Sequence, residues 1–163
     1  HKLNMAHAGV GSVSFTTCLL LNSILGVKPT SIPFNGTGPA LTALIAGQVD
    51  YMCDQIVNVV QQINGGQIKA YAIGTAERNP ALPNVPTTKE AGLPEFQAQA
   101  WNALFAPKGT PQPVLDKLTD ALDKALDDEQ TRKRLLELGS VLPDKVERGQ
   151  KALAALVKSE IAR

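Results

Sequence analysis

The chain has 163 residues, a formal net charge of +1 at pH 7, and a composition that is 44% hydrophobic but only 4% aromatic. This length suffices to bury the core of one domain or of two unequal ones. Because Lys and Arg are balanced by Asp and Glu and form no long runs, we expect neither nucleic acid nor an anionic membrane surface as a partner.

Residues 1–76 alternate between short apolar runs, which are typical of strands, and longer amphipathic runs, which are typical of helices. The predicted strands are 3–6, 30–34, 49–53 and 68–73, and the predicted helices are 13–25, 39–46 and 55–63. Strands separated by helices of this length form βαβ units with right-handed crossovers. The sequence therefore predicts an α/β fold with a mostly parallel sheet.

The run 7–12, His-Ala-Gly-Val-Gly-Ser, joins the first predicted strand to the first predicted helix. A strand that turns through two glycines into a helix leaves backbone N–H groups unpaired, and these donors suit a carboxylate or phosphate. Ala8, Gly9, Gly11 and Ser12 are therefore candidate ligand-binding residues. The Ser12 hydroxyl either caps the helix or contacts the ligand; we favour ligand contact, because glycine neighbours leave the backbone accessible.

A second turn of this kind occupies residues 34–40, Phe-Asn-Gly-Thr-Gly-Pro-Ala. It adds Asn35, Gly36 and Thr37 as candidate ligand-binding residues, and Thr37 has the same two possible roles as Ser12. Asp54 follows the third predicted strand, as a helix cap or a ligand contact. Because ligands of open α/β sheets gather at the carboxyl ends of strands, we expect the three loops to meet there.

Catalytic chemistry has little support in the sequence. His1 and His7 are the only histidines, so a Ser/His/Asp arrangement needs His7 with Ser12 or Ser14. Cys18 and Cys53 show no metal-ligand spacing. We expect no catalytic residue, metal or cofactor. Buried free thiols are the favoured interpretation of the cysteines, with a disulfide in an oxidising compartment as the alternative.

The second half of the chain changes in character. Pro80, Pro83 and Pro86 exclude a regular helix or central strand up to residue 86, and residues 86–92 resemble a short helix with a glycine stop. Trp101 stands in an apolar run, 98–105, that we expect to be a strand, with the indole as a packing residue.

The chain after residue 105 predicts helices only, within 114–126, 127–138 and 146–161, each with an apolar stripe. No later strand is available to cover these stripes. We therefore expect a homodimer or an exchange of helices between neighbouring chains.

Several motifs together resemble the substrate-binding proteins of tripartite tricarboxylate transporters, the Bug family. They are AGVGS at 8–12, PFNGTGPAL at 33–41, LIAGQVD at 44–50, GQIKAYAI at 66–73, PALPNVPT at 80–87 with EAG at 90–92, and APKGTP at 106–111. The family often has a small hydroxyl residue where His7 stands and a histidine where Phe15 stands.

This resemblance implies a periplasmic receptor of two hinged lobes, of the type II periplasmic-binding-protein fold, that closes on a small carboxylate or dicarboxylate. The receptor delivers its ligand to a membrane permease. Residues 1–103 look like the second lobe, and residues 104–163 look like the hinge return and terminal helices of a first lobe whose amino-terminal part is absent. The alternative is the effector-binding domain of a transcription regulator, which shares the two-lobed plan.

Overall fold

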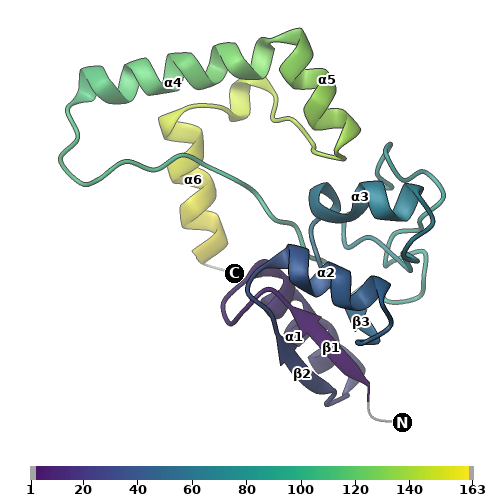
Figure 1. Cartoon of the computed structure of the whole chain (residues 1–163). Helices are drawn as coiled ribbons and strands as arrows, with labels where there is room; N and C mark the ends of the chain where they lie inside the picture. Colours follow the sequence, from purple (N-terminus) through teal and green to yellow (C-terminus); the bar gives the residue numbers. More distant parts are fainter. Residues whose placement is uncertain (1–2, 162–163) are drawn as a thin grey trace. The chain divides into compact units, whose positions relative to one another are not determined.

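The computed structural model describes residues 3–161 (Figure 1). The chain divides into two compact units, His1–Ala100 and Trp101–Arg163. None of the helices in the described part of the chain has the length and apolar composition needed to cross a membrane.

The first unit contains a three-stranded sheet and three helices (Figure 1). The strands are β1 (Asn4–His7), β2 (Thr30–Pro33) and β3 (Tyr51–Met52), and the helices are α1 (Val13–Leu25), α2 (Thr37–Ile45) and α3 (Ile56–Asn64). The order is β2-β1-β3 and both pairings are parallel, with His7 opposite Pro33 and Ala6 opposite Met52. The predicted α/β fold with a parallel sheet is confirmed.

Helices α1 and α2 pack on opposite faces of β1, because successive side chains of a strand point to opposite faces. Ala6 is fully buried in a cluster with Ala40 and Ala43 of α2. Its neighbour Met5 accepts a hydrogen bond at Sδ from the Asn22 amide of α1, at 3.2 Å. The first unit is thus a small doubly wound layer, although its β3 is shorter than predicted.

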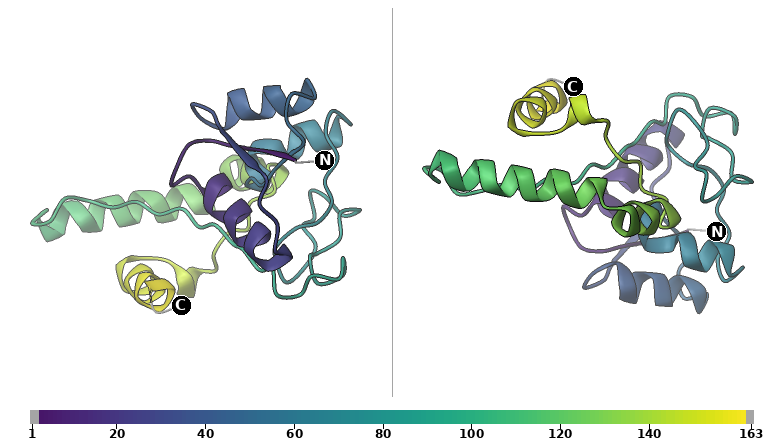
Figure 2. Two further views of the ribbon diagram at one scale, coloured as in Figure 1. Left: turned by 90° about the horizontal axis from the view of Figure 1, so that it is seen from below. Right: turned by 90° about the horizontal axis from the view of Figure 1, so that it is seen from above.

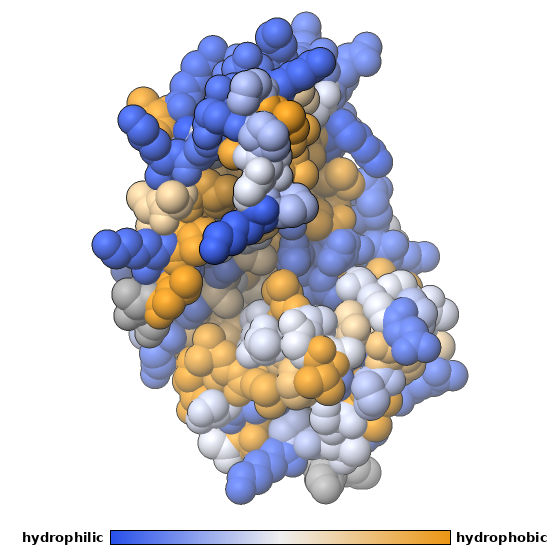
Figure 3. All heavy atoms as spheres, turned by 90° about the vertical axis from the view of Figure 1, so that its left-hand side faces the viewer, coloured by the Kyte–Doolittle hydropathy of each residue, from blue (hydrophilic) through white to orange (hydrophobic). Residues whose placement is uncertain are grey.

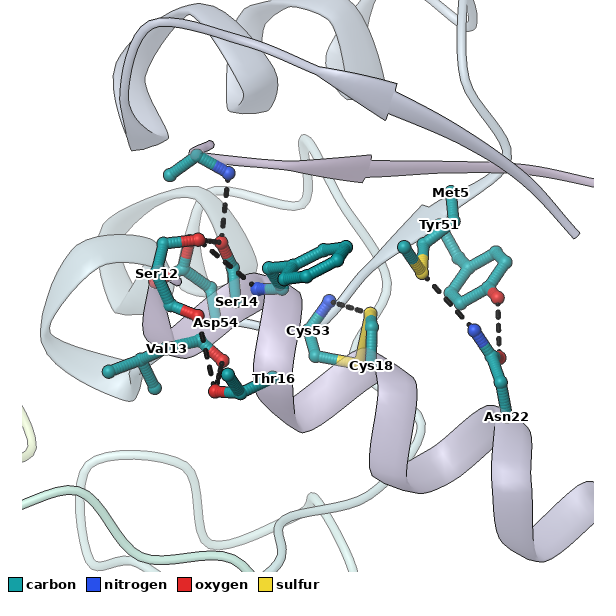
Figure 4. Close-up of a disulfide and its surroundings, with 12 residues drawn as sticks. Met5, Ser12, Val13, Ser14, Thr16, Cys18, Asn22, Tyr51, Cys53 and Asp54 are labelled. Carbon is teal, nitrogen blue, oxygen red and sulfur yellow. Dashed lines mark hydrogen bonds between the residues drawn. A yellow bond between two sulfur atoms is a disulfide. The ribbon is translucent and has the colours of Figure 1, made fainter. Parts of the chain in front are cut away.

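Cys18 of α1 and Cys53 after β3 form a disulfide (Figure 4). The favoured prediction of free thiols is therefore wrong. The cysteines are 35 positions apart in sequence, but the crossover from β1 to β3 places the end of β3 beside α1. Cys18 is completely buried, so this covalent link lies within the packed layer.

Residues 68–73 do not form the predicted fourth strand. Only an isolated parallel bridge joins Ile73 to Thr87, with Ile73 N–H donating to the Pro86 carbonyl at 2.9 Å. Pro86 has no N–H group with which to extend a ladder. The predicted short helix at 86–92 is a series of turns instead, in which the Thr87 amide donates to the Glu90 carboxylate at 2.7 Å.

The run 98–105 is not a strand either. Trp101 is 40% exposed, so the prediction of a packing residue is not supported. Ala98 lies against Gly74, where its N–H donates to the Gly74 carbonyl at 3.0 Å. The apolar composition of this run therefore marks a connecting segment between the units and not a member of the sheet.

All the regular secondary structure in the described part of the second unit is helical. Its elements are α4 (Gln112–Asp127), α5 (Glu129–Glu137), the 3-10 helix η1 (Lys145–Glu147) and α6 (Gln150–Ile161). Figure 2 shows α4 as a single straight helix. The predicted helix at 146–161 is divided in two, because Gly149 adopts a φ of +89° between η1 and α6.

Arg148, which follows η1, forms two ion pairs with α4. Its guanidinium donates to Asp123 and Asp127 of α4, each at 2.9 Å, and only 9% of its side chain is exposed.

No residue of α4, α5 or α6 is buried, and Figure 3 shows apolar side chains exposed on the molecular surface. The half-exposed or exposed apolar side chains of the three helices include Val114, Leu118, Leu122, Leu136, Leu156 and Ile161.

Candidate functional site

Three loops meet at one edge of the sheet, because all its strands are parallel and their carboxyl ends lie together. The loop after β1 adjoins the loop after β2, since the Phe34 amide donates to the His7 carbonyl at 2.9 Å. The loop after β2 adjoins the one after β3, since the Thr37 hydroxyl donates to Asp54 Oδ2 at 3.1 Å. These two hydrogen bonds thus join the three loops that carry the candidate residues.

Three main-chain amides of the first loop already donate hydrogen bonds to neighbouring residues. The Ala8 amide donates to Ser14 Oγ at 2.9 Å, the Gly9 amide to His7 Nδ1 at 3.2 Å, and the Ser12 amide to the Gly9 carbonyl at 3.2 Å. An anion cannot bind these three amides without breaking an internal bond. Of the candidate donors in this loop, the amides of Ala8, Gly9 and Ser12 are therefore already paired.

Ser12 is the N-cap of α1, with its Oγ accepting from the Phe15 amide at 3.2 Å (Figure 4). The same hydroxyl donates its proton to the Gly9 carbonyl at 2.7 Å, and Ser14 Oγ lies 3.0 Å away. Since Ser12 has one proton and Gly9 takes it, Ser14 is the donor in the Ser12–Ser14 pair. Neither hydroxyl retains a proton for a ligand, so the structure favours the capping role of Ser12.

The free donors of the first loop are the main-chain amides of Val10, Gly11 and Val13, which have no hydrogen-bond partner among residues 3–161. All three residues are exposed, Val10 by 86%. Gly11 has a φ of +82°, a conformation that side-chain-bearing residues rarely adopt. This glycine turns the chain into α1 while leaving its own N–H open to solvent.

The second loop is more open than the first. The amides of Asn35, Gly36, Thr37 and Gly38 have no partner in the described part of the chain. The N-cap of α2 is Gly36, which has no side chain to satisfy these donors and takes a φ of +108°. Thr37 is not the cap that the sequence allowed, because its hydroxyl binds Asp54.

Asp54 precedes the N-cap of α3, Gln55. Its Oδ1 accepts from the Gln55 amide at 2.7 Å and from the Asn58 side-chain amide at 2.6 Å, while Oδ2 accepts from Thr37. The carboxylate thus stabilises the start of α3 and also fixes the Thr37 hydroxyl. Asn58 was missed by sequence reasoning, although its position four residues after Asp54 is the usual spacing of a helix-surface pair.

His7 shapes the first loop and is unsuited to catalysis. It is 1% exposed. Because Nδ1 accepts from the Gly9 amide, Nε2 carries the proton and donates to Ser31 Oγ at 2.9 Å. The ring centroid lies 4.6 Å from that of Phe15. Both ring nitrogens are therefore occupied, and neither Ser12 nor Ser14 is bonded to the imidazole, so the weakly supported Ser/His/Asp arrangement is absent from the described residues.

The electrostatics of this edge come from the backbone. Helices α1 and α2 both begin here, and the partial positive charges of their N-termini favour an anion. Within the described residues, no group of His, Cys, Asp and Glu side chains is suited to a metal ion. The arrangement can hold a carboxylate or another anion through main-chain amides.

Several solved structures are similar to this chain in fold and sequence. MatC (Rpa3494) from Rhodopseudomonas palustris, solved with bound malate, is 56% identical with a TM-score of 0.94 over 99% of this chain and 55% of MatC. The periplasmic binding protein BugD is 40% identical with a TM-score of 0.91 over 98% of this chain and 53% of BugD. Rpa4515 from R. palustris, solved with adipate, is 28% identical with a TM-score of 0.88 over 100% of this chain and 54% of Rpa4515.

The chain spans about half the length of each of these proteins. The family description that matches it, over residues 1–163, is that of the tripartite tricarboxylate transporter family receptor, TctC. This match is to a family of receptors. The predicted resemblance is confirmed: the chain belongs to the tripartite tricarboxylate transporter receptor family.

Proposed function

We propose that this chain is part of a two-lobed receptor that binds a small carboxylate or dicarboxylate and delivers it to the membrane permease of a tripartite tricarboxylate-type transporter. The observation that carries the proposal is the presence of two sets of unpaired amides at one edge of the sheet, Val10, Gly11 and Val13 in the first set and residues 35–38 in the second. Helix N-termini with free N–H groups are suited to anions.

The ligands of the relatives support the same chemical class, since malate and adipate are both dicarboxylates. In this proposal the amides of Gly11, Asn35, Gly36 and Thr37 hold one ligand carboxylate. Ala8, Gly9 and Ser12 act indirectly, because their internal hydrogen bonds give the first loop its shape.

We assign residues 1–103 to the second lobe and residues 104–163 to the hinge return and terminal helices of the first. The absence of buried residues in α4, α5 and α6 supports this assignment, because such helices need a further surface to cover their apolar side chains. When the 163-residue chain is studied alone, these helices form a homodimer contact.

A periplasmic location is consistent with two observations. BugD is described as a periplasmic binding protein, and the Cys18–Cys53 disulfide is of the kind that persists in oxidising compartments such as the bacterial periplasm.

The test is an NMR titration of the ¹⁵N-labelled chain with malate and with adipate, each up to tens of millimolar at constant ionic strength. These concentrations are high enough to detect weak binding, which we expect because half of a cleft leaves its ligand partly solvated. We expect saturating shifts of the amide resonances of residues 10–13 and 35–38. The matched control is malate diamide, which has no charge and is expected to leave these resonances unchanged. Shifts elsewhere only, or none, would contradict the proposal.

A further inference from the structure

Asp54 places an unpaired negative charge beside the second set of amide donors. Its Oδ2 is 3.1 Å from the Thr37 hydroxyl oxygen, and the free Thr37 amide belongs to the same residue. Asp54 is partly exposed, and none of the ion pairs within residues 3–161 includes it. An anion on these amides therefore lies close to a carboxylate of like charge.

The hydrogen bonds of Asp54 leave it one acceptor position. An ionised carboxylate offers about four lone-pair positions. Thr37, Gln55 and Asn58 donate to three of them. Because Thr37 gives its only hydroxyl proton to Asp54, neither side chain has a proton to offer a ligand. This corner of the site accepts hydrogen bonds but donates them only through the main chain.

A ligand that presents only carboxylate oxygens here is repelled by the negative charge of Asp54. It also leaves the fourth hydrogen-bond acceptor position of Asp54 unused. A ligand with a hydroxyl or ammonium group beside its carboxylate fills that position and converts the repulsion into a charge-assisted hydrogen bond. We propose that Asp54 is a specificity-determining residue, which selects carboxylates that carry a hydroxyl or ammonium group on the adjacent carbon. This inference rests on the proposed function, because it requires that the loop amides bind the carboxylate.

The test compares malate with succinate, which differ only in the hydroxyl group, in the NMR titration of the 163-residue chain. A hydrogen bond to a charged acceptor predicts that malate binds about tenfold more tightly than succinate. In Asp54→Asn the charge is removed while the side-chain oxygen still accepts from Gln55. We expect the preference to fall to near unity in this variant, with tighter succinate binding than in the wild type.

The matched control is Asp50→Asn. Asp50 precedes β3, at the opposite edge of the parallel sheet, where its Oδ2 accepts from the Asn4 amide at 2.7 Å. This variant should keep the wild-type preference, and the thermal midpoints of both variants check that they fold. Equal affinities of the wild type for malate and succinate, or an unchanged preference in Asp54→Asn, would overturn the inference while leaving carboxylate binding intact. An absence of loop shifts with either ligand would instead overturn the proposed function.

Discussion

Reduction of the Cys18–Cys53 disulfide should remove a large share of the first unit's stability. The bridge closes a loop with a sequence separation of 35 residues. In the loop-entropy treatment, a loop of this size stabilises the native state by about 4 kcal/mol, because the unfolded chain is restricted. For a unit of about 100 residues, this free energy corresponds to a fall of about 20 °C in the unfolding midpoint.

The assay is thermal unfolding followed by circular dichroism, with and without reductant, on the wild type and on the double variant Cys18→Ala/Cys53→Ala. Cys18 is fully buried, so the variant also loses some packing. The reductant arm isolates the bridge, since the double variant should not respond to it. A fall of less than about 5 °C in reduced wild type would contradict the predicted stabilisation by the disulfide. Two titratable thiols in the denatured, unreduced protein would show that the disulfide is not formed.

Three other predictions concern the loops and the helical unit. Gly36→Ala should lower the unfolding free energy by about 1–3 kcal/mol, because φ is +108° there; calorimetry should find no such loss in Gly38→Ala, where an added Cβ meets open space. The hydrogen bond from the Arg78 guanidinium, and after it the bond from the Thr87 amide, lowers the pKa of Glu90 below its ordinary value of 4.5. The stabilisation that these bonds give the folded chain is therefore present above pH 4.5 and is lost as the pH falls through the lowered pKa. Glu90→Gln should therefore melt below the wild type at pH 7, and the two melting curves should converge in acid; a constant difference would contradict this. Light scattering should find dimers of the chain that dissociate in Leu118→Glu/Leu122→Glu, whereas a compact monomer at high concentration would exclude the helix contact.

The elements that sequence reasoning located well have strong local signals. Helix α1 matches its predicted bounds, because a capping serine precedes it and Gly26, with a φ of +65°, follows it. Residues 68–73 had an apolar pattern typical of a strand but no partner strand to pair with, since the proline-rich chain opposite them offers only Thr87. A local pattern describes what a segment can form, whereas pairing depends on the neighbour that the fold supplies.

The meeting of the three candidate loops was predictable, because parallel strands place their carboxyl ends together. The role of each donor was not. Ser12 and Thr37 could each cap a helix or bind a ligand, and the sequence favoured ligand contact for Ser12. The structure shows where each hydroxyl proton goes: the Gly9 carbonyl accepts that of Ser12, and Asp54 accepts that of Thr37. The sequence also could not decide between a disulfide and free thiols, because no spacing rule connects Cys18 with Cys53.

In the proposed receptor, main-chain amides at the starts of α1 and α2 hold a carboxylate. A crystal structure of the chain with malate tests it most directly. We expect carboxylate oxygens about 2.7–3.2 Å from amide nitrogens of both sets, Val10, Gly11 and Val13 in the first and residues 35–38 in the second. Malate bound to side chains elsewhere, with both sets of amides in contact with solvent, would contradict it.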